Sequence, residues 1–451
     1  MPVTSPLPLW KNFLRFLLPM LAGNILQSLF GTINNVYLGQ MIGVDALAAV
    51  TVLFPVMFGL IALVMGLSSG ASVLIGQAFG AGDNGKVKAI AGTTLSVALL
   101  FAMAIALTGS LLARELLLAL GTPPNILSAA IAYARVTMIS MPLTYAVILV
   151  TAMMRGVGDT VTPLLALVIY TLIGLVATPA MIAGWFGLPP LGAASAAWAS
   201  VVSSVLTLTW LHVYLRTRQH ALAFDRRFLR AMWPDGRLLR LVLRLGIPAS
   251  LSMMTMSVAE LVLLGLVNGY GSQATAAYGA VGQVMSYVQF PALSIAISVS
   301  IFGAQAIGRG QAGRIGAIVG TGLQMNLWLT GGLAGLGYLF ARPLMALFIT
   351  EAAVLDLAQG LLYIALWSIV PFGMATTFSG AVRSGGTVWT PLAISSFAIL
   401  AVEVPSAIYL SDRIGIAGVW MAYPIAFCTM FLLQMSYYRL VWRNRAAARL
   451  I

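Results

Sequence analysis

The feature that most constrains this chain is the recurrence of long apolar segments along its whole length. A helix needs roughly 20 apolar residues to cross a bilayer. Hydrophobic residues make up 60% of the 451 positions and charged residues only 8%, which is unlike a soluble domain. The sequence therefore predicts an all-α integral membrane protein with twelve transmembrane helices. These are expected at 13–38, 50–79, 89–113, 128–151, 163–184, 190–215, 243–268, 275–307, 316–340, 354–379, 389–410 and 416–438.

The polar segments between these spans are too short to form a soluble domain. The longest is interpreted as a cytoplasmic linker, so we expect an amino-terminal six-helix lobe at 1–215, the linker at 216–244 and a carboxy-terminal six-helix lobe at 245–451. No small-residue cleavage site follows the first apolar run. We therefore interpret that run as a retained helix and not as a signal peptide.

The distribution of lysine and arginine predicts the orientation in the membrane. If both termini are cytoplasmic, 20 of the 24 basic residues lie on the cytoplasmic side, and only Arg114, Arg342 and Arg413 lie on the other. This is the positive-inside bias of multi-pass proteins. The net charge of +13 is attributed to topology and to contact with anionic lipids, not to nucleic acid. We expect a bacterial inner-membrane protein.

The two halves are related in sequence at an offset of 228 residues. "GQAFGAGDNGKVKAIAG" (76–92) aligns with "AQAIGRGQAGRIGAIVG" (304–320) at eight identical positions of 17. "MRGVGDTVTPL" (154–164) aligns with "VRSGGTVWTPL" (382–392) at five of 11, and this pairs Arg155 with Arg383, which we interpret as cytoplasmic anchors. Because each half has an even number of helices, we expect a pseudo-two-fold axis along the membrane normal. Parallel repeats of this kind build transporters with a site between the lobes.

These motifs also carry a family resemblance. "GQAFGAGD", "MRGVGDTVTP" and "LGAASAAWAS", on a twelve-helix plan, resemble the multidrug and toxic compound extrusion (MATE) family over roughly 13–440. The resemblance implies two six-helix bundles around a V-shaped cavity. It also implies export of amphipathic, often cationic compounds in exchange for protons or sodium. We expect small molecules and membrane lipids as partners, no nucleic acid, and a functional monomer.

The sequence departs from the family pattern at two positions of the amino-terminal half. Many bacterial members have an aspartate late in the first helix, where "INNVYLGQ" places Asn34. Many have an Asp-Pro step in the fifth helix, where "VATPAM" places Thr178 before Pro179. A coupling mechanism that depends on those two acids does not transfer to this chain. We predict that Asn34 lines the substrate cavity.

Glu260 and Glu403 are the only two of the 11 acidic residues well inside predicted spans. A charge at mid-bilayer costs about 2.5 to 3.5 kcal/mol on insertion scales, so such residues usually face a cavity or a partner. Pro405 leaves the carbonyl of Ala401 without its helical donor, and a free carbonyl beside Glu403 suits a cation. We predict that Glu260 is the principal ion-coupling group and that Glu403 assists. Pairing of Glu403 with a base, or snorkelling to the interface, is the alternative.

Residues near Glu260 are predicted to line the substrate cavity. Met253 and Met256 share its helix face at spacings of three and four, and methionine repacks around ligands of varied shape. The alternative is that these methionines fill helix contacts. Gln283 and Tyr287, four residues apart in the span 275–307, offer hydrogen bonds to a substrate, with bridging between helices as their alternative.

The predicted function is a secondary antiporter for multidrug efflux that works by alternating access. No Walker-type phosphate loop occurs, so we expect no cofactor and an ion gradient as the driving force. Protons are favoured and no metal site is predicted, with sodium at Glu260 as the alternative. A lipid-linked precursor flippase is the alternative function, but it typically needs a strongly cationic cavity, and only Arg135 lies inside a span. An enzyme is not expected, because His212 and His220 lie near the linker and no catalytic cluster occurs.

Overall fold

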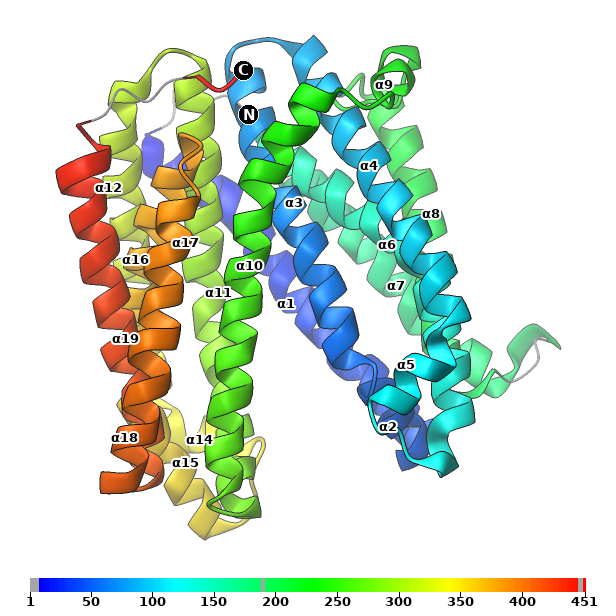
Figure 1. Cartoon of the computed structure of the whole chain (residues 1–451), viewed down its shortest axis with the longest axis vertical. Helices are drawn as coiled ribbons and strands as arrows, with labels where there is room; N and C mark the ends of the chain where they lie inside the picture. The colour runs from blue at the N-terminus through cyan, green and yellow to red at the C-terminus, as the bar shows by residue number, and fades with distance from the viewer. Residues whose placement is uncertain (1–7, 188–190, 445–448) are drawn as a thin grey trace. The chain divides into compact units, whose positions relative to one another are not determined.

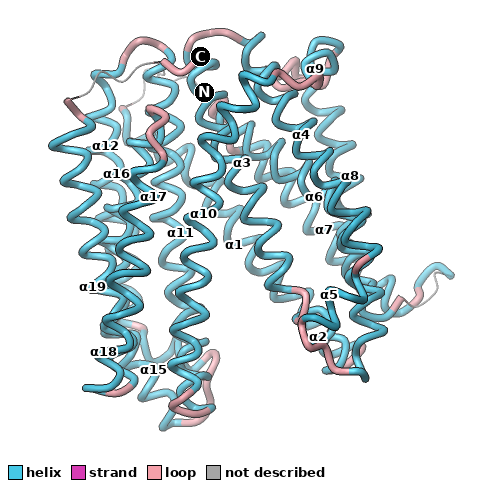
Figure 2. Tube along the Cα trace, in the orientation of Figure 1, coloured by secondary structure: helices cyan, strands magenta, loops and turns pink. Residues whose placement is uncertain are grey.

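The computed structural model describes residues 8–187, 191–444 and 449–451. Across these ranges the regular secondary structure is helical, and no β-strand occurs in them (Figures 1 and 2). The all-α prediction is therefore confirmed. Residues 1–7, and Arg445 of the basic carboxy-terminal group, lie outside the described residues.

The helices of the first half include two short 3₁₀ turns, labelled η1 and η2. In chain order they are α1 (Leu9–Met41), α2 (Val44–Thr51), α3 (Phe54–Gly80), α4 (Asn84–Leu111), α5 (Ala113–Ala119), α6 (Pro124–Gly156), α7 (Val161–Ala183), η1 (Trp185–Gly187), η2 (Gly192–Ala194), α8 (Ser195–Thr217) and α9 (Arg226–Ala231).

The helices of the second half include three π-helical segments, η4, η6 and η7, and two further 3₁₀ turns, η3 and η5. In chain order they are α10 (Gly236–Asn268), α11 (Ser272–Gly308), η3 (Ala312–Arg314), α12 (Ile315–Met325), η4 (Asn326–Thr330), α13 (Gly331–Leu339), α14 (Ala341–Ala346), α15 (Ala352–Ala365), η5 (Leu366–Ser368), α16 (Ile369–Ser384), α17 (Trp389–Ser396), η6 (Phe397–Glu403), α18 (Val404–Ile414), α19 (Ile416–Ser436) and η7 (Tyr437–Trp442).

Eleven helices of the described residues are long and apolar enough to cross a membrane, by length and composition. They correspond to eleven of the twelve predicted spans. The remaining span, 316–340, is also helical, but it is divided into α12, η4 and α13. Gln324, Asn326 and several glycines make it less apolar than the others. The structure thus has eleven strongly apolar helices and a twelfth, more polar one.

The chain forms two compact units. The carboxy-terminal unit comprises 248–451 together with 1–21 and 80–82, and the amino-terminal unit comprises 22–79 and 83–247. The first part of α1 therefore belongs to the carboxy-terminal unit, where the rings of Phe13 and Phe16 lie 4.9 and 5.0 Å from that of Phe302. The domain boundaries drawn from the sequence repeat stay a prediction.

The predicted linker is folded onto the amino-terminal unit. Asp225 caps α9 by accepting a hydrogen bond from the backbone N–H of Phe228 at 2.8 Å. The same carboxylate forms an ion pair with Lys88 of α4. Gly92 of α4 lies so close to α9 that a Cβ there would be 2.5 Å from the carbonyl oxygen of Ala231. The segment is thus held by a helix cap, an ion pair and a close backbone contact.

Small residues allow α11 and α16 of the carboxy-terminal unit to pack closely along their lengths. A Cβ added at Gly380 of α16 would lie 2.4 Å from the carbonyl oxygen of Ala296 in α11. Gly303 of α11 similarly leaves room for the Ser384 side chain, whose oxygen would lie 2.6 Å from an added Cβ. Contacts between small residues are how helices approach one another in lipid, where dispersion replaces the hydrophobic effect.

Replacing one of these glycines should separate the effect of close packing from that of helix propensity. We expect Gly380→Ala to lower the free energy of unfolding by about 1 to 3 kcal/mol, because a backbone oxygen blocks the added methyl group. Gly332→Ala, where nothing lies within 4 Å, should instead gain about 0.5 to 1 kcal/mol from reduced backbone entropy. Thermal unfolding of the detergent-purified protein measures both. Equal midpoints for the two variants would contradict the close contact.

Candidate functional site

The two intramembrane acids lie in the same unit. Glu260 is on α10, and Glu403 is the last residue of the π-helical segment η6, two residues before Pro405. π-Helical turns are rare and are frequent at functional sites. The two carboxyl groups are close enough to interact electrostatically. The structure therefore brings together the pair that the sequence predicts.

Two tyrosines complete a four-residue group, which we call the carboxyl–tyrosine cluster. Tyr278 of α11 and Tyr423 of α19 are hydrogen-bonded through their hydroxyl groups, with the oxygens 3.0 Å apart. Each phenol also interacts electrostatically with both Glu260 and Glu403. The cluster thus gathers oxygen-bearing side chains from α10, α11, η6 and α19.

Sequence analysis missed the two tyrosines. A single tyrosine in an apolar helix carries no motif, and the contact between Tyr278 and Tyr423 joins residues 145 positions apart. One signal was available, because Tyr423 directly precedes Pro424, much as Glu403 precedes Pro405. Proline inside a helix disturbs the backbone hydrogen bonds around it, so polar residues close to such prolines are candidates for a functional site.

The two acids differ in burial. Glu403 is 5% exposed, and no lysine, arginine or histidine of the described residues forms an ion pair with it. A charge buried without a partner costs several kcal/mol, so Glu403 requires a proton or a cation nearby. Glu260 is exposed on the surface of the chain. Glu260 is thus the more accessible of the two acids.

Two groups of buried apolar side chains pack against the tyrosines of the carboxyl–tyrosine cluster. The first group comes from α10, α11, α18 and α19 and consists of Leu263, Val267, Ala274, Ala407, Val419 and Ala422. The second group consists of Ala292, Phe372, Ala375, Ala398, Ala426, Phe427 and Met430. Tyr423 packs against both groups. Apolar surroundings of this kind lower the local dielectric constant and therefore strengthen the interactions between charges.

The residues predicted to line the cavity of the carboxy-terminal half all lie in the carboxy-terminal unit. Met253 and Met256 are half-buried on α10, on the turns that precede Glu260. Gln283 and Tyr287 are half-buried on α11, and the ring of Tyr287 packs edge-on against Phe290 at 5.7 Å. Their assignment to a substrate cavity stays a prediction.

Asn34 and Thr178, which replace the two acids of the family pattern, contact each other in the amino-terminal unit. The hydroxyl group of Thr178 on α7 donates a hydrogen bond to the side-chain oxygen of Asn34 on α1 at 3.0 Å. Thr178 is fully buried. Asn34 and Thr178 thus form a neutral, mutually satisfied pair, and the role of Asn34 in substrate binding stays a prediction.

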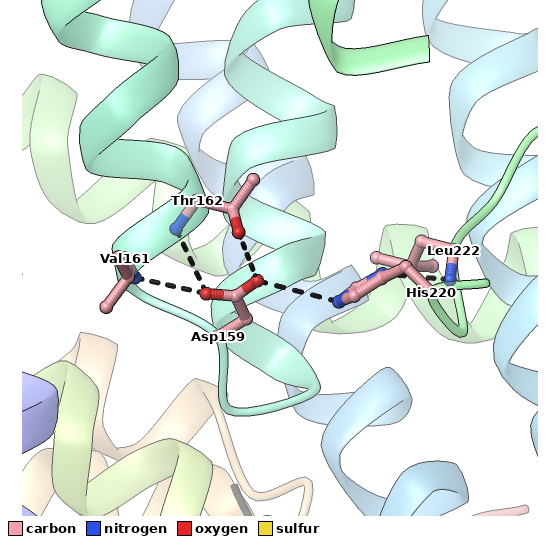
Figure 3. Close-up of polar contacts among 5 residues, drawn as sticks. All are labelled: Asp159, Val161, Thr162, His220 and Leu222. Atoms are coloured by element: carbon pink, nitrogen blue, oxygen red, sulfur yellow. Dashed lines mark hydrogen bonds and ion pairs between the residues drawn. The ribbon is translucent and has the colours of Figure 1, made fainter. Parts of the chain in front are cut away.

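A second polar group lies outside the membrane-spanning helices and joins the α6–α7 turn to the linker (Figure 3). Asp159 accepts hydrogen bonds from the backbone N–H groups of Val161 and Thr162 at 3.1 and 3.0 Å and from the Thr162 hydroxyl at 2.6 Å. Its carboxylate lies 3.6 Å from Nε2 of His220. Nδ1 of His220 accepts a hydrogen bond from the N–H of Leu222 at 3.2 Å. The neutral ring therefore carries its proton on Nε2.

This geometry predicts a stability that depends on pH. Burial lowers the pKa of His220 below its ordinary value of 6.5, although Asp159 acts in the opposite direction. The unfolded chain therefore binds the extra proton more readily, so stability is complete above the ordinary pKa and falls as the pH drops through it. Between about pH 7.5 and about pH 5.5 the native protein should lose more stability than His220→Gln.

Unfolding midpoints at the two pH values measure this difference. His212→Gln, which removes the other histidine, is the control and should behave like the native protein. An equal loss of stability in the native protein and His220→Gln would show that His220 does not carry the effect.

Comparisons with known proteins place the chain in a family. One family model, MatE, matches twice, at residues 19–180 and 248–409. The probable multidrug resistance protein YoeA of Bacillus subtilis is 43% identical over 444 residues, which cover 98% of this chain and 96% of YoeA. The FAD transporter of Shewanella oneidensis is 25% identical over 440 residues, which cover 97% of this chain and 95% of that protein.

The fold agrees with that of solved transporters. A variant of the Vibrio cholerae MATE transporter VcmN matches with a TM-score of 0.89 at 21% identity, covering 97% of this chain and 98% of that chain. The apolar helices and the repeated architecture define a multi-pass membrane transporter. The chain belongs to the MATE family, which confirms the resemblance. Because the one model matches both halves, it also supports the duplication.

Proposed function

We propose that this protein is a secondary antiporter that exports amphipathic, cationic small molecules by alternating access. The observation that carries the proposal is the buried carboxyl group of Glu403, which interacts with Glu260 and has no basic partner in the described chain. The names of YoeA and of the Staphylococcus aureus multidrug export protein MepA support efflux of drugs. Small molecules are the proposed substrates, and the proposed functional form is a monomer surrounded by lipid.

In this mechanism Glu260 couples ion and substrate, and Glu403 assists. Two nearby carboxylates repel each other, so a proton bound to one changes the electrostatic environment of the other. The proton-free pair attracts an organic cation, and protonation weakens that attraction and favours release outside. The hydroxyl groups of Tyr278 and Tyr423 are hydrogen-bond donors that can turn towards an ionised carboxylate.

A second acid allows the transporter to exchange two protons in each cycle, which increases the free energy available for export. Exchange of a monocation for one proton moves no net charge, so only the pH difference drives it, at about 1.4 kcal/mol per unit. A second proton per cycle also draws on the membrane potential, at about 2.3 kcal/mol per elementary charge for 100 mV. Two carboxyl groups thus allow the transporter to maintain a larger ratio of substrate concentrations across the membrane.

Protons are the proposed driving ion, and sodium bound at Glu260 is the alternative. Support comes from the amino-terminal unit, where the neutral Asn34–Thr178 hydrogen bond stands where many bacterial members have acids. Uptake of a labelled organic cation into everted vesicles, under an imposed pH gradient or an imposed sodium gradient, distinguishes the two ions.

Acidic side chains at the site favour a cationic substrate over an anionic one. A flippase for lipid-linked pyrophosphates, or a carrier for an anionic nucleotide such as the one named for the Shewanella relative, needs positive charge at the substrate. The carboxyl–tyrosine cluster has two acids and no basic member. Addition of FAD as a competitor in the same vesicle assay tests this point, because a cation-selective site should be unaffected.

Removal of either carboxylate should affect coupling more than binding. Glu260→Gln should abolish gradient-driven transport, with a loss of more than about tenfold, equivalent to at least about 1.4 kcal/mol, while some substrate binding remains. Glu403→Gln should reduce accumulation more than affinity. Transport into everted vesicles and equilibrium binding of the same substrate measure the two properties.

Glu115→Gln is the matched control, since Glu115 is an exposed acid on α5, and it should transport normally. Normal accumulation by Glu260→Gln against a gradient would refute the coupling role. In that case Asn34 and its neighbours become the next residues to test.

The proposed location is the bacterial inner membrane, with both termini and the linker in the cytoplasm. Arg230 of α9 is exposed, so Arg230→Cys in a Cys428→Ala background provides one reporter thiol. We expect a membrane-impermeant reagent to label it in everted vesicles and not in intact cells, because the basic residues flank the cytoplasmic side. Labelling of intact cells would reverse the assigned orientation.

A further inference from the structure

The end of the carboxy-terminal unit at which α11 and α16 end carries basic side chains and no acid among the described residues of that unit (Figure 1). At the opposite end the charges are balanced, because Arg342 and Asp356 form an ion pair at 2.9 Å and further acids lie nearby in sequence. The basic residues of the first end are Lys11, Arg15, Arg309, Arg314, Arg383, Arg439, Arg443 and Arg449.

In the amino-terminal unit, two lysines of α4 have acidic partners. Lys86 lies 3.9 Å from Asp83, and Lys88 pairs with Asp225. The Asp159 carboxylate accepts hydrogen bonds from the backbone N–H groups of Val161 and Thr162 at the start of α7. Asp83 and Asp225 therefore supply counter-charge to Lys86 and Lys88, and Asp159 caps the backbone.

The carboxy-terminal repeat keeps the basic residue and lacks the acids. At the repeat offset, Arg155 corresponds to Arg383, whereas Asp83 corresponds to Gln311 and Asp159 corresponds to Thr387. The two turns that carry aspartate in the first repeat are thus uncharged in the second.

Two of these arginines have guanidinium atoms without a partner. Nη1 of Arg309 and Nε of Arg383 are buried and form no hydrogen bond within the described chain. Neither residue forms an ion pair with a described acid. Burial lowers the pKa of Arg309, and the positive charge of Arg314 lowers it further. A buried guanidinium nitrogen without a hydrogen-bond partner is costly, so an external anion would stabilise this end.

We propose that the ends of α11 and α16 bind the phosphate group of an anionic phospholipid through Arg309 and Arg383. The two helices contact each other near these ends, because Gly303 of α11, six residues before Arg309, lies against Ser384, the neighbour of Arg383. Guanidinium groups bind phosphate oxygens through paired N–H donors. Both arginines terminate membrane-spanning helices, the level at which basic pockets between helices meet lipid headgroups. Free phosphate shares the same chemistry and is the other source to be tested.

The test follows the unfolding midpoint of the full-length, detergent-purified protein as lipid is added. Phosphatidylglycerol should raise the midpoint more than the same amount of phosphatidylcholine, because a ligand that binds the folded state stabilises it. A variant with Arg309→Gln and Arg383→Gln should lose most of this difference. Arg413→Gln, which removes an arginine from the opposite end, is the control and should keep it.

A second variant adds an acid to the second repeat at the position equivalent to Asp159 of the first. Thr387→Asp places a carboxylate where the first repeat has Asp159, and Thr390 stands where that repeat has Thr162, so the same helix cap can form. This variant should be more stable without lipid and should respond less to phosphatidylglycerol. It removes no arginine, so it gives a result even if the double variant does not fold.

Each outcome decides the proposal. An equal response to inorganic phosphate would support the anion site and assign it to a soluble phosphate. An equal phosphatidylglycerol effect in the native protein, the double variant and Thr387→Asp would overturn it. Because the readout is stability and not transport, failure here is distinct from failure of the antiport proposal.

Discussion

The need to satisfy every backbone N–H and C=O group without water is the constraint on which the rest of this structure depends. In hydrocarbon only helices and closed barrels meet that need, and this chain meets it with helices along its described length. Once the backbone is satisfied within each helix, side chains determine which helices approach closely. Glycine therefore has a structural role in this protein, since at Gly380 and Gly303 a neighbouring atom occupies the space that a Cβ would need.

The same constraint makes polar side chains in the spans informative. An acid inside the membrane must be protonated, paired or placed beside a cation or water. Glu403 is deeply buried and interacts with Glu260, while the phenol pair Tyr278–Tyr423 adds hydroxyl groups that can respond to either charge state. Tyr423 also packs against two apolar groups of the same unit. The cluster thus gathers two carboxyl groups and two phenol hydroxyl groups within one unit.

Much of the fold could be predicted from the sequence, because span length and hydropathy are local properties and a duplication is visible by alignment. Glu260 and Glu403 could be identified because charges are rare in spans, which makes each one conspicuous. Tyr278 and Tyr423 could not, since tyrosine is common in such helices and their contact depends on how α11 and α19 pack. The contact between Asn34 and Thr178 could not be predicted either. The family pattern indicated two separate departures, and only the fold showed that the two residues are hydrogen-bonded to each other. The assignment of the first residues of α1 to the carboxy-terminal unit is likewise a property of tertiary packing.

The Asn34–Thr178 hydrogen bond also has an evolutionary consequence. Asparagine and aspartate have nearly the same shape, and every asparagine codon becomes an aspartate codon by a single base change. A carboxylate at position 34 would still accept the hydrogen bond from Thr178, so the surrounding helices need not rearrange to receive it. A lineage carrying this chain therefore lies one point mutation away from an acidic group in its amino-terminal unit, at a position where the neighbouring hydrogen-bond donor is already in place.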